Sequence, residues 1–190
     1  MFQCRMCTEN PFALLFGEKK LPDNSAAGGA ASSEARAKEA QKKQAKDPLA
    51  IRKSRPQQHR TPAEVEEVIK KWEQCCHARA LEYFVSEEVF LSVLRQIATC
   101  TSKTEDPILG GGDECVIWYG EATQGSTQAA LRVTKPGEEE ESITYVNRVL
   151  AFIFATDESF QELMKLPREP FVMACGNQLC TNLSHISVAV

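Results

Sequence analysis

The sequence lacks any run of about 20 apolar residues, the length that a helix needs to cross a bilayer. Residues 1–16 also lack the order of basic, apolar and small residues that defines a secretory signal. From these two absences we expect a soluble intracellular protein without a membrane partner. We expect it in the nucleus or the cytoplasm, with the nucleus preferred because a basic segment suited to nuclear import follows at 34–60.

Large apolar residues are almost absent from residues 21–60, which consist mainly of Ala, Gly, Ser, Lys, Gln and Pro. Such a composition cannot bury enough surface to offset the entropy lost on ordering. The chain is therefore predicted to contain a short N-terminal segment with a Cys-x2-Cys motif at 1–20, a disordered basic linker at 21–60, a helical region at 61–100 and a second folded region at 101–190.

The net charge of −4 conceals an uneven distribution. Residues 34–60 contain nine Lys and Arg against three Asp and Glu, whereas residues 61–190 contain ten against twenty. Unpaired cations release counterions from a nucleic acid, so the basic segment favours nucleic-acid contact or nuclear import, although a merely solubilising linker has the same composition. The candidate nucleic-acid contacts are Lys42, Lys43, Lys46, Arg52, Lys53, Arg55, Arg60 and, in the folded part, Arg132.

Two amphipathic helices are predicted at the start of the folded part. Thr61, Pro62 and Glu64 provide a capping hydroxyl, a first-turn proline and an acid at the third helical position. Apolar residues then recur at steps of three and four, and Ser86 supplies a second cap. The pattern predicts helices at about 62–83 and 87–99.

The next part of the chain changes from helical to mixed character. The three glycines at 110–112 interrupt any helix, and β-branched and aromatic residues follow. The pattern predicts a strand at 115–120, a hairpin that follows it at 121–133 and contains a second strand at 128–133, an acidic loop after Gly137, and helices at 143–154 and 157–166. Together with the preceding helices, these elements predict an α+β fold.

Eight cysteines in a chain without an export signal favour free thiols or metal ligands over disulfides. Cys175, Cys180 and His185 follow one another with four residues between each pair, and a tetrahedral zinc ion needs four such ligands. Cys115 is the candidate for the fourth, because a bond from it would tie the hairpin to the C-terminal loop. Buried reduced cysteines beside an ordinary histidine are the alternative.

A second metal site is a weaker hypothesis. Cys4 and Cys7 form half of a zinc-ribbon-like site, which Cys75, Cys76 and His77 could complete across the linker. Cys76 already fits the buried face of the first predicted helix, so this site is not favoured.

The loop around the three C-terminal ligands resembles the zinc-binding loop of the His-Me finger (HNH-type) homing endonucleases. It reads Cys-Gly-Asn-Gln-Leu-Cys-Thr-Asn-Leu-Ser-His-Ile at 175–186. Upstream, Cys115, Trp118 and Gly120 match the Cys-x-x-Trp-x-Gly start of related proteins, and 146–148 stand where the family has Ala-His-Arg. The resemblance covers 113–190. It implies a His-Me finger-like hairpin and helix stapled by Zn²⁺ through Cys115, Cys175, Cys180 and His185, with the two helices and the disordered arm preceding this homing-endonuclease-like domain.

The same resemblance implies a missing active site. The family places its general base two residues before the first loop cysteine, where this chain has Met173. The asparagine that the family uses to hold its catalytic cation lies beyond His185, and the sequence stops at Val190. We expect a catalytically inactive zinc module that binds nucleic acid, DNA rather than RNA, or a nuclear protein, with homodimerisation as in many family members. The alternatives are an active metal-dependent endonuclease and a protein-interaction scaffold without nucleic acid, so enzyme activity stays an open question at this point.

Overall fold

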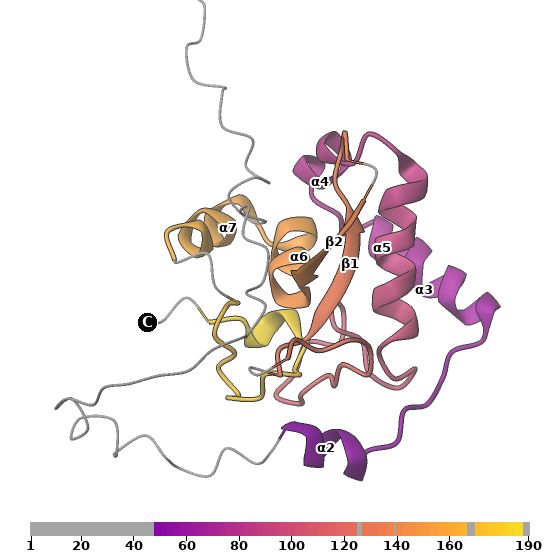
Figure 1. Cartoon of the computed structure of the whole chain (residues 1–190), viewed down its shortest axis with the longest axis vertical. Coiled ribbons are helices and arrows are strands. Elements are labelled where there is room, and N and C mark those ends of the chain that lie inside the picture. Colours follow the sequence, from indigo (N-terminus) through magenta and orange to yellow (C-terminus); the bar gives the residue numbers. More distant parts are fainter. Residues whose placement is uncertain (1–47, 125–126, 139, 167–169, 188–190) are drawn as a thin grey trace, which may run out of the picture.

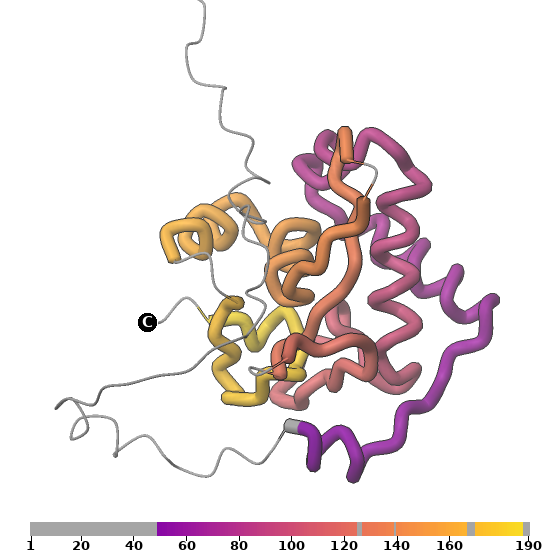
Figure 2. The backbone as a smooth tube through the Cα atoms, viewed as in Figure 1, coloured from indigo at the N-terminus to yellow at the C-terminus, as the bar shows by residue number. Residues whose placement is uncertain are grey.

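A computed structural model of the chain describes residues 48–124, 127–138, 140–166 and 170–187 (Figures 1 and 2). The predicted ligands and contacts Cys4, Cys7, Lys42, Lys43 and Lys46 lie outside the described residues. Among the helices of the described part, none combines the length and hydropathy that crossing a bilayer requires. The elements in chain order are α2 (Pro48–Ser54), α3 (Pro62–Glu73), α4 (Ala78–Tyr83), α5 (Glu87–Thr99), β1 (Ala130–Thr134), β2 (Glu141–Tyr145), α6 (Val146–Phe154), α7 (Asp157–Met164) and the 3-10 helix η2 (Leu183–His185).

The two strands form a small antiparallel sheet that lies between two helices. Their register pairs Ala130 with Tyr145 at one end and Thr134 with Glu141 at the other. In Figure 1, α5 lies on one side of the strands and α6 on the other, and α3 packs against α5. This combination of helices with one two-stranded sheet confirms the predicted α+β class.

The hydrophobic core joins the helices around this sheet. Trp72 of α3, Leu94 of α5 and Phe152 of α6 are fully buried. The ring of Phe152 makes edge contacts with Tyr83 and Phe160, at centroid distances of 5.5 and 5.9 Å. Because burying one large apolar side chain stabilises a fold by roughly 1.5–3 kcal/mol, this cluster holds α4 and α7 against α6.

The start of the helical region is as predicted. Thr61 and Glu64 form a reciprocal capping box, in which the Thr61 N–H donates to the Glu64 carboxylate at 2.7 Å and the Glu64 N–H donates to the Thr61 hydroxyl at 3.3 Å. α5 begins after Ser86, whose hydroxyl accepts from the Val89 N–H. Both helix starts depend on contacts within three residues, which is why the sequence reveals them.

The prediction of one continuous helix at 62–83 is wrong. α3 ends at Glu73, and α4 begins after His77, whose ring Nδ1 accepts from the Arg79 N–H at 3.3 Å. The His77 N–H donates instead to the Ile153 carbonyl at 2.8 Å, so the chain leaves the direction of α3 in order to pack on α6. Apolar residues of α3 and of α4 both face the core, so their spacing in the sequence does not reveal the break between the two helices.

The hairpin predicted at 121–133 forms at its inner end, where Ala122 pairs with Ala129 and the Thr123 N–H donates to the Gln128 carbonyl at 2.9 Å. The strand predicted before it finds its partner elsewhere. Residues 116–118 pair with the C-terminal loop, through the Trp118 N–H to the Leu179 carbonyl and the Thr181 N–H to the Val116 carbonyl, both at 2.8 Å. β1 pairs with β2, which occupies the first three positions of the helix predicted at 143–154. Ile143, Thr144 and Tyr145 are residues that favour strands, and helix α6 begins only at Val146.

The predicted disordered linker does not extend to Arg60. Residues 48–60, called the basic strap below, form helix α2 and an extended segment that runs along the folded part (Figure 1). The Gln57 side chain donates to the Thr99 carbonyl at 2.6 Å, and the backbone of Gln58 bonds with Ser102 and Lys103. Polar contacts to main-chain groups hold the strap, so the absence of large apolar residues was a poor guide to its structure.

Candidate metal centre

The structure brings Cys115, Cys175, Cys180 and His185 together, with their ligand atoms all within 4.8 Å of one another. The Nδ1 atom of His185 lies 3.4 Å from the Cys180 Sγ and 3.9 Å from the Cys115 Sγ. Donors around a tetrahedral zinc ion lie about 3.5–3.8 Å apart, given Zn–S bonds of about 2.3 Å and Zn–N bonds of about 2.0–2.1 Å. The four residues therefore fit a single tetrahedral ion, and the sequence analysis had named this same set.

The loop that carries the two neighbouring cysteines is shaped by short-range hydrogen bonds. Gly176 has φ +69°, a left-handed conformation that favours glycine, and its N–H donates to the Met173 carbonyl at 2.8 Å. The Asn177 side chain accepts from the Leu179 N–H, and the Cys180 N–H donates to the Asn177 carbonyl, both at 3.0 Å. These turns direct the Cys175 and Cys180 thiols toward the same point.

The histidine ligand is oriented by its second ring nitrogen. His185 Nε2 lies 3.2 Å from the Gly112 carbonyl oxygen, which can only accept a hydrogen bond, so Nε2 carries the proton and Nδ1 presents its lone pair to the thiols. Donation of the free ring N–H to a carbonyl is the usual arrangement at protein zinc sites.

Asn182 joins the histidine turn to the segment that leads to Cys115. Its Oδ1 accepts from the Ser184 N–H at 3.0 Å, and its Nδ2 donates to the Glu114 carbonyl at 2.9 Å. Asn182 is only 3% exposed, so these bonds are protected from water. This role of Asn182 is not among the predictions from the sequence, although an asparagine before a short turn is a recognisable capping signal.

The three thiols hold their protons unequally. A hydrogen bond from Cys180 lowers the pKa of Cys175 to about 5, against the opposing effect of burial. Burial raises the pKa of Cys115 to about 11, and a hydrogen bond to Cys175, together with burial, raises the pKa of Cys180. Near neutral pH the metal-free cluster therefore carries one thiolate beside two thiols, and a divalent cation has to displace the two remaining protons.

Met173, at the position of the general base in the homing endonucleases, is buried in the core. Met173 is 5% exposed, and its backbone pairs with that of Ile186 next to the histidine ligand. The Asn147 side chain of α6 donates to the Phe171 carbonyl at 2.7 Å and lies 3.8 Å from the Met173 sulfur. A thioether accepts no proton near neutral pH, so Met173 packs the metal loop against α6 and cannot serve as a base.

The strap contacts the segment of the first cysteine ligand. Arg55 donates to the Cys115 carbonyl at 3.3 Å and forms an ion pair with Glu105 at 3.0 Å. The second oxygen of Glu105 accepts from the Ile117 N–H at 3.0 Å. Arg55 and Glu105 thus hold the backbone on both sides of Val116 and restrain the position of Cys115.

The other arginines proposed as nucleic-acid contacts also have partners within the protein. Arg52 donates to the Tyr119 and Gly120 carbonyls. Arg60 donates to four carbonyls at the end of α5 and just beyond it, at distances of 2.6–2.9 Å: those of Ala98, Thr101, Ser102 and Glu105. Arg132 pairs with Glu121 at 3.0 Å, whereas Lys53 has an exposed side chain. The structure therefore assigns structural contacts to Arg52, Arg55, Arg60 and Arg132, which the sequence analysis had assigned to phosphates.

No protein-family model, curated protein or solved structure matches this chain. The arrangement of the site therefore carries the functional argument. Its four ligands come from two places, a segment near residue 115 and a loop at 175–185, and they meet because 116–118 pair with 179–181.

Proposed function

We propose that this protein is a zinc-stabilised binding module without hydrolytic activity. The observation that carries the proposal is the complete set of four protein donors at one point, Cys115, Cys175, Cys180 and His185. A zinc ion held by three thiolates and one imidazole has no open position for water or substrate, which is the mark of a structural site. The ion would close the fold by joining two segments that are 60 residues apart in sequence.

The resemblance to the His-Me finger homing endonucleases over 113–190 supports the metal assignment. It does not support catalysis, because the position of the family's general base holds the buried thioether of Met173. Loss of a general base alone lowers a rate by about 10²–10⁴. An active endonuclease is therefore the weaker alternative.

The proposed partner is a nucleic acid, DNA in preference to RNA, or a nuclear protein. Lys42, Lys43, Lys46 and Lys53 are the cations proposed for phosphate contact, since the arginines of the strap bind main-chain carbonyls. The acidic composition of 61–190 opposes a nucleic acid and suits a cationic protein surface. Protein binding is accordingly the second candidate, with homodimerisation as one form of it.

Metal analysis of the purified chain tests the structural half of the proposal. We expect about one zinc ion per chain by inductively coupled plasma mass spectrometry, and none in Cys180→Ser, because three donors hold the ion far less tightly than four. Cys75→Ser is the matched control, since this exposed cysteine lies outside the cluster. A value near zero or near two for the natural chain contradicts the proposal.

Retention on DNA-cellulose tests the choice of partner. If the lysines contact phosphates, replacing Lys42, Lys43 and Lys46 by alanine weakens retention and reduces the slope of log K against log salt by about 3. Equal retention of the natural chain and the triple variant would show that other groups bind the DNA, whereas no retention of either removes nucleic acid and leaves a protein partner.

A further inference from the structure

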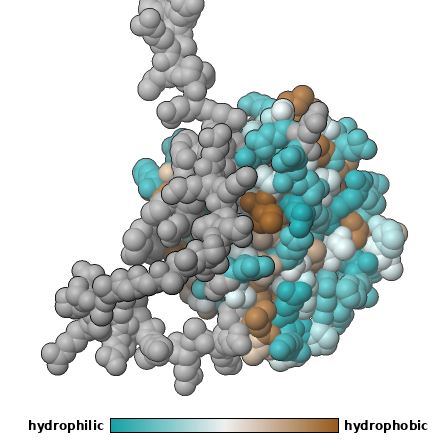
Figure 3. All heavy atoms as spheres, viewed as in Figure 1, coloured by the Kyte–Doolittle hydropathy of each residue, from teal (hydrophilic) through white to brown (hydrophobic). Residues whose placement is uncertain are grey.

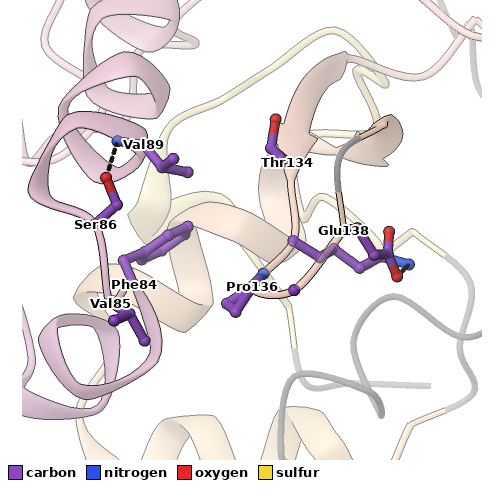
Figure 4. Close-up of a pocket in the computed structure, with 9 residues that line it drawn as sticks. Phe84, Val85, Ser86, Val89, Thr134, Pro136 and Glu138 are labelled. Atoms are coloured by element: carbon purple, nitrogen blue, oxygen red, sulfur yellow. Dashed lines mark hydrogen bonds and ion pairs between the residues drawn. The ribbon is translucent and has the colours of Figure 1, made fainter.

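A pocket opens between the corner that joins α4 to α5 and the turn that joins β1 to β2 (Figure 4). Its volume is about 360 Å³, near the small end of the roughly 300–1,000 Å³ typical of ligand sites. In Figure 4 the ring of Phe84 and the side chain of Val85 face Pro136 across this space. The lining residues are Phe84, Val85, Ser86, Val89, Thr134, Lys135, Pro136, Gly137 and Glu138.

The lining of the pocket includes an exposed apolar side chain. Val85 is 87% exposed, while Phe84 is buried at the base. The face of the protein seen in Figure 3 is largely hydrophilic, and its apolar residues form separate spots. One of these spots lies at the end of the molecule where α4 and the β1–β2 turn are found in Figure 1. An exposed valine in an apolar pocket indicates a binding surface, because a partner that enters the pocket also buries the valine.

The polar groups of the lining do not converge on a small-molecule ligand. The Ser86 hydroxyl already accepts from the Val89 N–H, and Lys135 pairs with Glu138 at 3.4 Å. A polar metabolite would need several free groups directed at one point. The pocket suits one bulky apolar side chain presented by a larger partner.

The charge around the pocket selects the partner. The two segments that contribute the lining residues, 84–89 and 134–138, contain three glutamates and a single lysine, Lys135, and three further glutamates follow in the sequence at 139–141. Burial raises the pKa of Tyr83, and the negative charge of Glu138 raises it further. A field of this sign repels nucleic acid, anionic lipid and the same face of a second copy, and it attracts cations.

We propose that this pocket binds a cationic peptide segment of a partner protein through one bulky apolar side chain, with the flanking Lys or Arg residues lying against the glutamates. The inference does not rest on the metal centre, because none of the lining residues belongs to the Cys115, Cys175, Cys180 and His185 cluster. The affinity of the partner peptide should depend both on its bulky apolar side chain and on its positive charge.

Three short peptides separate these two requirements. The probe is acetyl-KKWKK-amide, and its controls are KKGKK, which lacks the apolar side chain, and EEWEE, which reverses the charge. We titrate each into the ¹⁵N-labelled full-length protein and follow amide chemical shifts. We expect KKWKK to bind at least about tenfold more tightly than either control, to shift the amides of Val85 and Gly137, and to bind about fivefold more weakly in 0.5 M than in 0.05 M salt.

Variants of exposed residues complete the test without unfolding the protein. Val85→Ser and Glu138→Lys should each weaken KKWKK binding by about fivefold or more, whereas Ile143→Ser, an equally drastic change at a residue 48% exposed on β2, should leave it unchanged. Equal binding of KKWKK and KKGKK would show attraction by charge alone and overturn the proposal. The proposal would also be overturned if Val85→Ser bound KKWKK as tightly as the natural chain, or if the amide chemical shifts changed only on other surfaces of the protein.

Discussion

The side-chain amide of Gln96 pairs with both backbone groups of Arg132. Its Nε2 donates to the Arg132 carbonyl at 2.9 Å, and its Oε1 accepts from the Arg132 N–H at 3.2 Å. Gln96 lies on α5 and Arg132 at the centre of β1, so a helix side chain occupies the place that a third strand would take. The edge of β1 is thereby covered at Arg132, as sheet edges in stable proteins generally are.

We expect Gln96→Leu to destabilise the protein by about 1–2 kcal/mol, because it removes two hydrogen bonds between helix and sheet while nearly preserving side-chain volume. The uncovered edge should also promote association between chains. Urea denaturation measures the first effect and light scattering the second. Gln161→Leu, at an exposed position of α7, is the control. If the two variants unfold at the same urea concentration, Gln96 does not hold the sheet.

Removing one metal ligand should unfold the C-terminal half of the chain. Structural zinc contributes about 10 kcal/mol or more of apparent binding free energy, far above the stability of a small α+β core. We therefore expect Cys180→Ser, or treatment of the natural chain with a strong chelator, to expose the amides of 173–187 to rapid hydrogen exchange. Cys75→Ser should exchange as the natural chain does. Unaltered protection after chelation would show that packing alone holds this loop.

Metal binding should release about two protons per ion near neutral pH. Cys175, with its pKa lowered to about 5, is already a thiolate, whereas the raised pKa values of Cys115 and Cys180 keep these thiols protonated. Affinity should consequently rise with pH, since protons compete with the metal for both thiols. Calorimetric titration of Zn²⁺ in two buffers of different ionisation enthalpy counts the protons. Release of three would show that Cys175 is also protonated before the metal binds.

Replacement of Arg60 should destabilise the fold although the residue lies in the segment predicted to be disordered. Its guanidinium binds four carbonyls in the last turn of α5 and just beyond it, and an ammonium group cannot span them. We expect Arg60→Lys to cost about 2–3 kcal/mol, since hydrogen bonds from charged groups contribute about 1.5–3 kcal/mol each. Arg95→Lys, at an ion pair with Glu66 on the surface, should cost less than about 1 kcal/mol. Equal urea midpoints for the two variants would contradict the structural role of Arg60.

The protein should not nick supercoiled plasmid in the presence of Mg²⁺, Mn²⁺ or Ca²⁺, and Met173→His should not restore nicking. A histidine at this buried position would lie beside Asn147 of α6, and it would supply a proton acceptor without a cation to stabilise the charge on the phosphate. Nicking by the natural chain, lost in Cys180→Ser and absent from a mock purification, would establish an active endonuclease.

The sequence by itself determined the features that depend on neighbouring residues. The capping box of Thr61 and Glu64 and the helix at 87–99 require contacts over three or four positions, which a linear pattern displays. The spacing of Cys175, Cys180 and His185 likewise lies within a single loop, and thiol and imidazole groups at that spacing identify a metal site through their chemistry.

Only the tertiary structure decided which distant segments meet. Residues 116–118 pair with 179–181, and β1 pairs with β2, because strand pairing depends on which surfaces the whole chain buries. The role of Arg60 was hidden for a related reason, since its acceptors are carbonyl oxygens that every residue possesses. The identity of a side chain reveals the chemistry that it can perform with its neighbours in sequence. A contact to a distant backbone carbonyl leaves no such pattern. Only the fold therefore shows that the basic strap belongs to the domain.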